Sequence, residues 1–193
     1  MKRKYALFAL IAAFALMLAG CSGGESAQER GFTVAVLDTY IDSAKVEAYG
    51  ASLERETPAA FTALSMGDSQ NDPMSAVAGA AAFTTQVASG EIDVVIAPPQ
   101  VVAASARSET FMPLTELFSP EELAAIDDAL WIDYELYDEN LAPTGERTPA
   151  CGIDVSQDEG LQSVLGKQQI GVYVVVNTAY PDQARQMVLD YLG

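Results

Sequence analysis

The sequence of 193 residues contains no histidine and only two cysteines, Cys21 and Cys151. Without histidine there is no Ser-His-Asp or Cys-His catalytic set, no histidine general base and no histidine-ligated zinc site. Cys151 would need a base to act as a nucleophile, and no imidazole exists for that role. We therefore expect a buried, inert Cys151, no catalytic residue, no metal site and no cofactor.

Basic residues are also scarce, with ten Lys and Arg against 27 Asp and Glu. Three of the ten lie within the first four residues, and every acid lies after residue 20. The chain beyond residue 20 thus has seven bases and 27 acids, a formal net charge of −20. Such a chain offers no basic patch that could displace counterions from a phosphate backbone. A nucleic-acid partner is not expected.

A strongly apolar stretch without charged residues, Tyr5–Ala19, directly follows the basic start. Its 15 residues suit the apolar region of a signal peptide and fall short of a membrane-spanning helix. It ends in Leu18-Ala19-Gly20-Cys21, which matches the bacterial lipobox. We predict that residues 1–20 are a signal peptide and that Cys21 is lipidated. The alternative is an ordinary signal peptide followed by an incidental cysteine.

The anchor predicts where the protein works. Two acyl chains on Cys21 attach a protein stably, whereas one chain gives only marginal binding. Residues 21–31 are small, polar and rich in Gly and Ser, as in a flexible tether. We expect a single α/β domain over residues 32–193. It would be held at the outer side of the cell membrane, with the membrane itself as one partner.

Apolar runs and helix signals alternate through the first half of the domain. Residues 32–37, 61–66 and 92–96 have the composition of strands. Helices are predicted over 44–56, 73–89 and 100–107; Asp42 or Ser43 would cap the first, and Asp72 the second. This β-α-β-α-β-α order is typical of a parallel sheet with helical crossovers.

The second half is less regular. The capping box Ser119–Glu122 and Pro120 predict a helix running to about Leu130. Residues 131–137 alternate apolar and acidic side chains, which predicts a strand with one wet face. The rest of the chain is expected to form a loop or hairpin tip at 138–150, strands at 151–155 and 170–176, and helices at 158–165 and from Pro181. The predicted fold class is α/β, a mostly parallel sheet with helices on both faces and a possible antiparallel hairpin near 131–155.

Three segments resemble the extracellular solute-binding proteins, lipoproteins that deliver solutes to ABC importers. They are Ala88-Ser89-Gly90-Glu91-Ile92-Asp93-Val94-Val95, Phe111-Met112-Pro113-Leu114 and Asn177-Thr178-Ala179-Tyr180-Pro181-Asp182-Gln183-Ala184. The resemblance covers about 110 of the 193 residues. Family members have two lobes and about twice this length, so the resemblance implies a single lobe. It also implies a bound solute and an ABC permease as a possible partner.

In an open parallel sheet, ligands bind beyond the carboxyl ends of the strands. The candidate ligand-binding residues are therefore those that follow the three predicted strands: Asp38, Thr39, Tyr40, Ser69, Gln70, Asn71 and Gln100. Asp38 would suit an amine, and Tyr40 could stack on a ring or sugar face. We expect non-catalytic binding of a small solute. The alternative is a structural or interaction lipoprotein, a degenerate lobe kept as a scaffold in an envelope complex.

Overall fold

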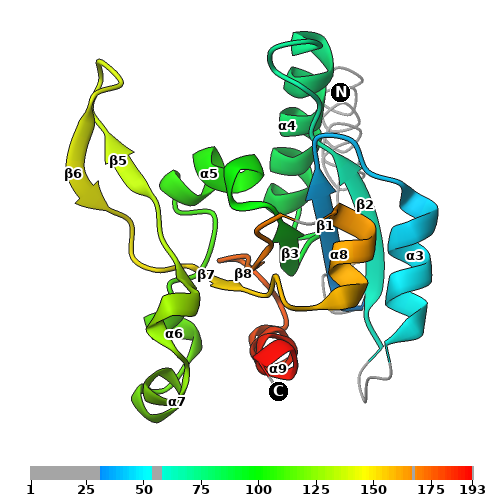
Figure 1. The fold of residues 1–193 in the computed structure, drawn as a ribbon, viewed down its shortest axis with the longest axis vertical. Coiled ribbons are helices and arrows are strands. Elements are labelled where there is room, and N and C mark those ends of the chain that lie inside the picture. Colours follow the sequence, from blue (N-terminus) through cyan, green and yellow to red (C-terminus); the bar gives the residue numbers. More distant parts are fainter. Residues whose placement is uncertain (1–30, 54–57, 167, 193) are drawn as a thin grey trace, which may run out of the picture. The chain divides into compact units, whose positions relative to one another are not determined.

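The computed structural model describes residues 31–53, 58–166 and 168–192 (Figure 1). The predicted signal peptide, Cys21 and all of the tether except Gly31 lie outside the described residues. Among the described residues, no helix is both long enough and apolar enough to cross a membrane. The description below concerns the compact unit Gly31–Gly193.

The first half of this unit is the parallel part of a sheet. Its elements in chain order are β1 (Thr33–Asp38), α3 (Ser43–Ser52), β2 (Ala60–Ser65), α4 (Pro73–Ala88), β3 (Val94–Ala97) and α5 (Pro99–Arg107). Strand β1 lies between β2 and β3 and pairs in parallel with both. The predicted β-α-β-α-β-α order is confirmed. All four residues of β3 are buried, as expected of a strand covered on both faces.

Local capping chemistry explains where the helices begin. Asp42 accepts a hydrogen bond from the Ala44 N–H at 3.0 Å, and Asp72 accepts one from Ser75 at 3.2 Å. Each carboxylate thereby satisfies an N–H group that has no partner within its own helix. The predicted helix over 44–56 ends earlier, at Ser52, because Leu53 is extended. Residues 54–57 lie outside the described residues.

The whole sheet is mixed, so the prediction of a mostly parallel sheet is wrong. Its six strands have the order β2-β1-β3-β8-β7-β4, and three of the five pairings are antiparallel. The added strands are β4 (Trp131–Ile132), β7 (Gly152–Asp154) and β8 (Gly171–Val174). The apolar run of β8 predicts a buried strand but carries no information about direction. Its register against β3, with Ala97 opposite Gly171, makes it antiparallel.

Two apolar clusters lie on opposite faces of the sheet. Val34 and Val36 of β1 belong to one cluster, and Ala35 and Leu37 belong to the other, as the alternation of a strand requires. The first cluster includes residues of α3 and of three further helices, α6 (Leu114–Leu117), α8 (Glu159–Leu165) and α9 (Pro181–Leu192). The second includes Phe83 of α4 and two residues of α5. Helices therefore cover both faces.

Residues 120–137 differ from the prediction at two points. The capping box is present, but helix α7 spans only Pro120–Ala125, and the 3₁₀ turn η2 (Asp128–Leu130) follows it. Asp127 accepts from the Ala129 N–H at 3.0 Å and so starts this separate turn.

The single strand predicted for 131–137 is wrong. It is divided between β4 and a separate antiparallel hairpin, β5 (Glu135–Tyr137) with β6 (Pro143–Arg147). Asp133 and Tyr134 separate the two strands, and Tyr134 is buried in the same apolar cluster as Ile132. The antiparallel hairpin predicted near 131–155 is confirmed.

Asp93, within the segment that carries the solute-binding resemblance, is buried and has a structural function. Its carboxylate accepts hydrogen bonds from the Thr33 N–H and from the Thr178 hydroxyl, both at 2.8 Å. These bonds join the start of β1 to the loop that precedes α9. A buried carboxylate needs such donors, because burying it unpaired is costly.

Candidate functional site

At the carboxyl ends of the parallel strands, the structure connects two of the seven predicted residues. The Gln168 amide donates to Asp38 Oδ2 at 3.4 Å and accepts from Gln100 Nε2 at 3.4 Å. Gln168 precedes β8, and because β8 runs antiparallel to β3 its start lies at the same edge as the end of β3. Sequence reasoning missed Gln168 because the direction of β8 was not known.

The contacts of the other predicted residues lie mostly within their own loops. The Thr39 N–H donates to Asp38 at 2.7 Å, and Tyr40 points to solvent with 62% of its surface exposed. The Gln70 and Asn71 N–H groups donate to Asp68, as does the Asn71 side chain, and these bonds lower the pKa of Asp68. Ser69 lies in the same exposed turn. None of the contacts described for 69–71 joins this turn to Asp38 or Gln100.

A cavity of about 480 Å³ lies at the opposite edge of the sheet. Helix α5 begins after the carboxyl end of β3 and leads away from it. Val174 pairs with the first residue of β3, and Val176, which lines the cavity, lies two residues beyond Val174. The cavity is therefore beyond the amino end of β3. Its lining comes from α5, the connector to α6, the hairpin and the segment before β7: Ala106, Arg107, Glu109, Phe111, Pro113, Glu116, Leu136, Arg147, Thr148, Pro149, Cys151 and Val176.

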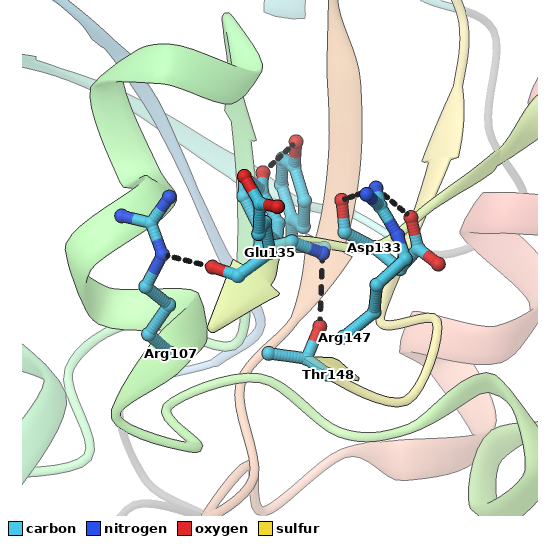
Figure 2. Close-up of polar contacts among 7 residues, drawn as sticks. Arg107, Asp133, Glu135, Arg147 and Thr148 are labelled. Carbon is cyan, nitrogen blue, oxygen red and sulfur yellow. Dashed lines mark hydrogen bonds and ion pairs between the residues drawn. The ribbon is translucent and has the colours of Figure 1, made fainter. Parts of the chain in front are cut away.

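Two arginines line this cavity from different elements, on either side of residues 133–135 (Figure 2). Arg147 of β6 forms an ion pair with Asp133 at 2.5 Å, and its guanidinium lowers the pKa of that carboxyl. Arg107, in the last turn of α5, donates from Nε to the Glu135 carbonyl at 2.8 Å. Its guanidinium carbon lies 4.8 Å from the centre of the Tyr137 ring, a cation–π distance.

Beneath the cavity is a buried aromatic layer. The Tyr134 and Tyr173 hydroxyls form a hydrogen bond of 2.8 Å, and the ring of Phe111 lies 4.9 Å from that of Tyr173. The Thr148 hydroxyl accepts from the Tyr134 N–H at 3.1 Å and so fixes the base of the hairpin (Figure 2). Phe111, which lines the cavity, therefore packs against a buried and hydrogen-bonded pair of tyrosines.

The free cysteine, Cys151, also reaches the cavity, and it is buried as predicted. Burial, together with the charge of Asp133, raises the pKa of its thiol from 9.0 to about 11. The thiol is therefore protonated at neutral pH and is a poor nucleophile. Among the described residues, no group of three or more acidic or cysteine side chains is arranged to hold a metal ion.

Comparisons of the chain with protein-family models, curated proteins and solved structures found no match. The chemistry of the residues that line the cavity is therefore what indicates a site. Sequence reasoning passed over Arg107 and Arg147, although one signal pointed to them. With only seven bases after residue 20, two that line one cavity stand out, but their proximity depends on contacts between distant segments.

Burial of these groups predicts a loss of stability at alkaline pH. The pKa of Tyr134 is raised from 10.0 to about 12, chiefly by burial, and that of Tyr173 is raised as well. The folded state holds these protons, and the Cys151 proton, more tightly than the unfolded state does. Their contribution is complete below pH 9 and is lost as the pH rises from about 9 towards 12.

Urea denaturation at pH 7 to 11 checks this expectation. Cys151→Ala is the matched variant, because it removes the group with the lowest unfolded pKa while both tyrosines remain. Its decline in stability should begin about one pH unit later than that of the parent. Identical pH profiles for the two proteins would contradict the assignment.

Proposed function

We propose that this chain is an exported lipoprotein, anchored through Cys21, whose α/β domain binds a small solute without chemical change. The single observation that carries the proposal is the cavity beside Arg107. Its volume of about 480 Å³ lies within the range of small-molecule sites. It also has the composition of such sites, with mostly apolar walls and a few charged groups.

One part of the fold supports the proposed resemblance to one lobe of a solute-binding protein. Three strands in the order β2-β1-β3, with helical crossovers, form a sheet covered on both faces. The six-stranded sheet continues through antiparallel strands contributed by the C-terminal half. We propose that the domain is such a lobe and that delivery to an ABC permease follows binding.

A solute screen tests the proposal. The native protein in neutral detergent would be melted with amino acids, sugars, peptides, polyamines, organic acids and metal ions. A solute at 100 times its Kd stabilises the folded state by about 2.7 kcal/mol, which corresponds to several degrees in Tm for a domain of this size. We expect at least one class to produce such a shift.

Two tryptophan variants locate the binding. Val176→Trp places an indole at the cavity wall from a side chain that is half exposed. Val77→Trp adds the same group on an exposed position of α4 that does not line the cavity. The first should abolish the shift and the second should leave it unchanged. Absence of any shift across the screen, or equal behaviour of the two variants, would contradict the proposal.

The second candidate is a scaffold lipoprotein of an envelope complex, and the hairpin favours it. All five residues of β6 are exposed, and Leu141 at the hairpin turn is 83% exposed. The hairpin is a sheet of its own, separate from the six-stranded sheet (Figure 1). Pull-down from detergent extracts with the parent protein and with Leu141→Asp would test it. A stoichiometric partner lost only in the variant would support the scaffold.

A further inference from the structure

Arg107 is the cavity's available cation. Its Nε donates to the Glu135 carbonyl, and among the described residues its two terminal nitrogens form no hydrogen bond. Within the described part of the chain, no carboxylate lies within ion-pair distance of this guanidinium. A guanidinium oriented through Nε presents its terminal nitrogens as a fork, the geometry that matches a planar carboxylate.

The charges of the lining oppose a ligand with more than one negative charge. The second arginine, Arg147, is already neutralised by Asp133. Glu109 and Glu116 also line the cavity and oppose additional negative charge. A phosphate or a dicarboxylate would meet this repulsion, whereas a single carboxylate is matched by Arg107.

Apart from Thr148, the remaining lining is apolar, and it indicates the nature of the rest of the ligand. Phe111, Leu136 and Val176 lie around the cavity, with two prolines and Ala106. Burial of apolar ligand surface against such walls stabilises the complex. Hydroxyl groups of a sugar that face these apolar walls would lose their hydrogen bonds to water without replacement.

We propose that the cavity binds an organic monocarboxylate with an apolar body, and that Arg107 forms a bidentate ion pair with its carboxylate. This inference rests on the proposed function, since it names the class of solute. Arg107 acts by direct contact with the ligand, while its bond to Glu135 positions it.

Isothermal titration of the full native protein in neutral detergent tests the inference, with a detergent-only blank. The probes are the sodium salts of butanoic, hexanoic, 4-methylpentanoic, benzoic and phenylacetic acids, each paired with its primary amide. The amide has nearly the same shape and no charge. The best carboxylate should bind at least tenfold more tightly than its amide, because charge-assisted hydrogen bonds are stronger than neutral ones.

Three variants test whether Arg107 causes the preference for the carboxylate over its amide. Arg107→Gln should weaken carboxylate binding about 10- to 100-fold and remove the preference over the amide. Arg185→Gln is the matched control, since it removes an arginine that is paired with Glu122 and does not line the cavity, and should preserve the preference. Glu116→Gln, at an exposed side chain, should strengthen carboxylate binding about 2- to 5-fold and leave amide binding unchanged. This last variant does not disturb the contacts of Arg107, so it tests the inference even if Arg107→Gln fails to fold.

The possible failures can be distinguished. If amides bind as tightly as carboxylates, or if Arg107→Gln keeps the preference, the inference is overturned. Binding of a solute of another class, with no carboxylate bound, overturns the inference and leaves the proposed function standing. If no solute of any class binds, both are wrong.

Discussion

Changing Leu18 and Cys21 together to alanine should release the protein from the membrane. The double change removes the thiol and leaves small residues at the cut site for an ordinary signal peptidase. Each buried CH₂ of an acyl chain contributes about 0.8 kcal/mol, and two chains give stable anchoring. The loss of both chains should therefore move nearly all of the protein from the membrane fraction to the soluble fraction.

Carbonate extraction followed by immunoblotting measures this result. Cys151→Ala is the matched control, because it removes the other cysteine and should leave the protein fully anchored. Mass spectrometry of the native protein should find Cys21 as the first residue, carrying a diacylglycerol. Firm membrane association of the double variant, or an unmodified first residue, would contradict the proposed anchor.

Gly152→Ala should destabilise the domain by about 2–3 kcal/mol, the cost of overpacking a dense core. Gly152 of β7 lies opposite Tyr173 of β8, and the tyrosine ring covers it. A Cβ at position 152 would stand 2.6 Å from Cδ1 of this fully buried ring, closer than carbon atoms pack. The ring cannot move aside, because its hydroxyl is bonded to Tyr134 and Gly171 lies against its far end.

Urea denaturation would measure this cost, and a double-mutant cycle provides the control. In a Tyr173→Leu background the ring is absent, so Gly152→Ala should cost less than about 1 kcal/mol. The single and double variants would then show a large coupling energy. An equal cost in both backgrounds would mean that the glycine is needed for a reason other than the ring.

Local signals predicted the helix starts, while contacts between distant segments decided the rest of the fold. Asp42, Asp72 and the Ser119–Glu122 box act within three residues, so the sequence reveals them directly. The direction of β8 depends on pairing with β3, more than 70 residues away. A buried apolar run has the same composition in either direction, and the mixed sheet could not be predicted from it.

The same distinction applies to the candidate site. Asp38 and Gln100 follow parallel strands, and they lie at one edge of the sheet, as expected of residues beyond the carboxyl ends of such strands. The position of Gln168, which bridges them, depends on the direction of β8. The cavity is assembled from α5, the hairpin and the end of β8, none of which is adjacent to the others in the sequence. Arg107 and Arg147 are 40 residues apart in the sequence. They line one cavity because the hairpin, which contributes Arg147, lies beside the end of α5, which contributes Arg107.

We propose that a small solute occupies the cavity beside Arg107. Hydrogen–deuterium exchange of the native protein, with and without the tightest-binding solute of the screen, tests it most directly. We expect slower exchange in residues 106–116 and 147–151, which supply most of the cavity lining. Slower exchange confined to 38–40, 69–71 and 100, at the opposite edge of the sheet, would contradict the claim.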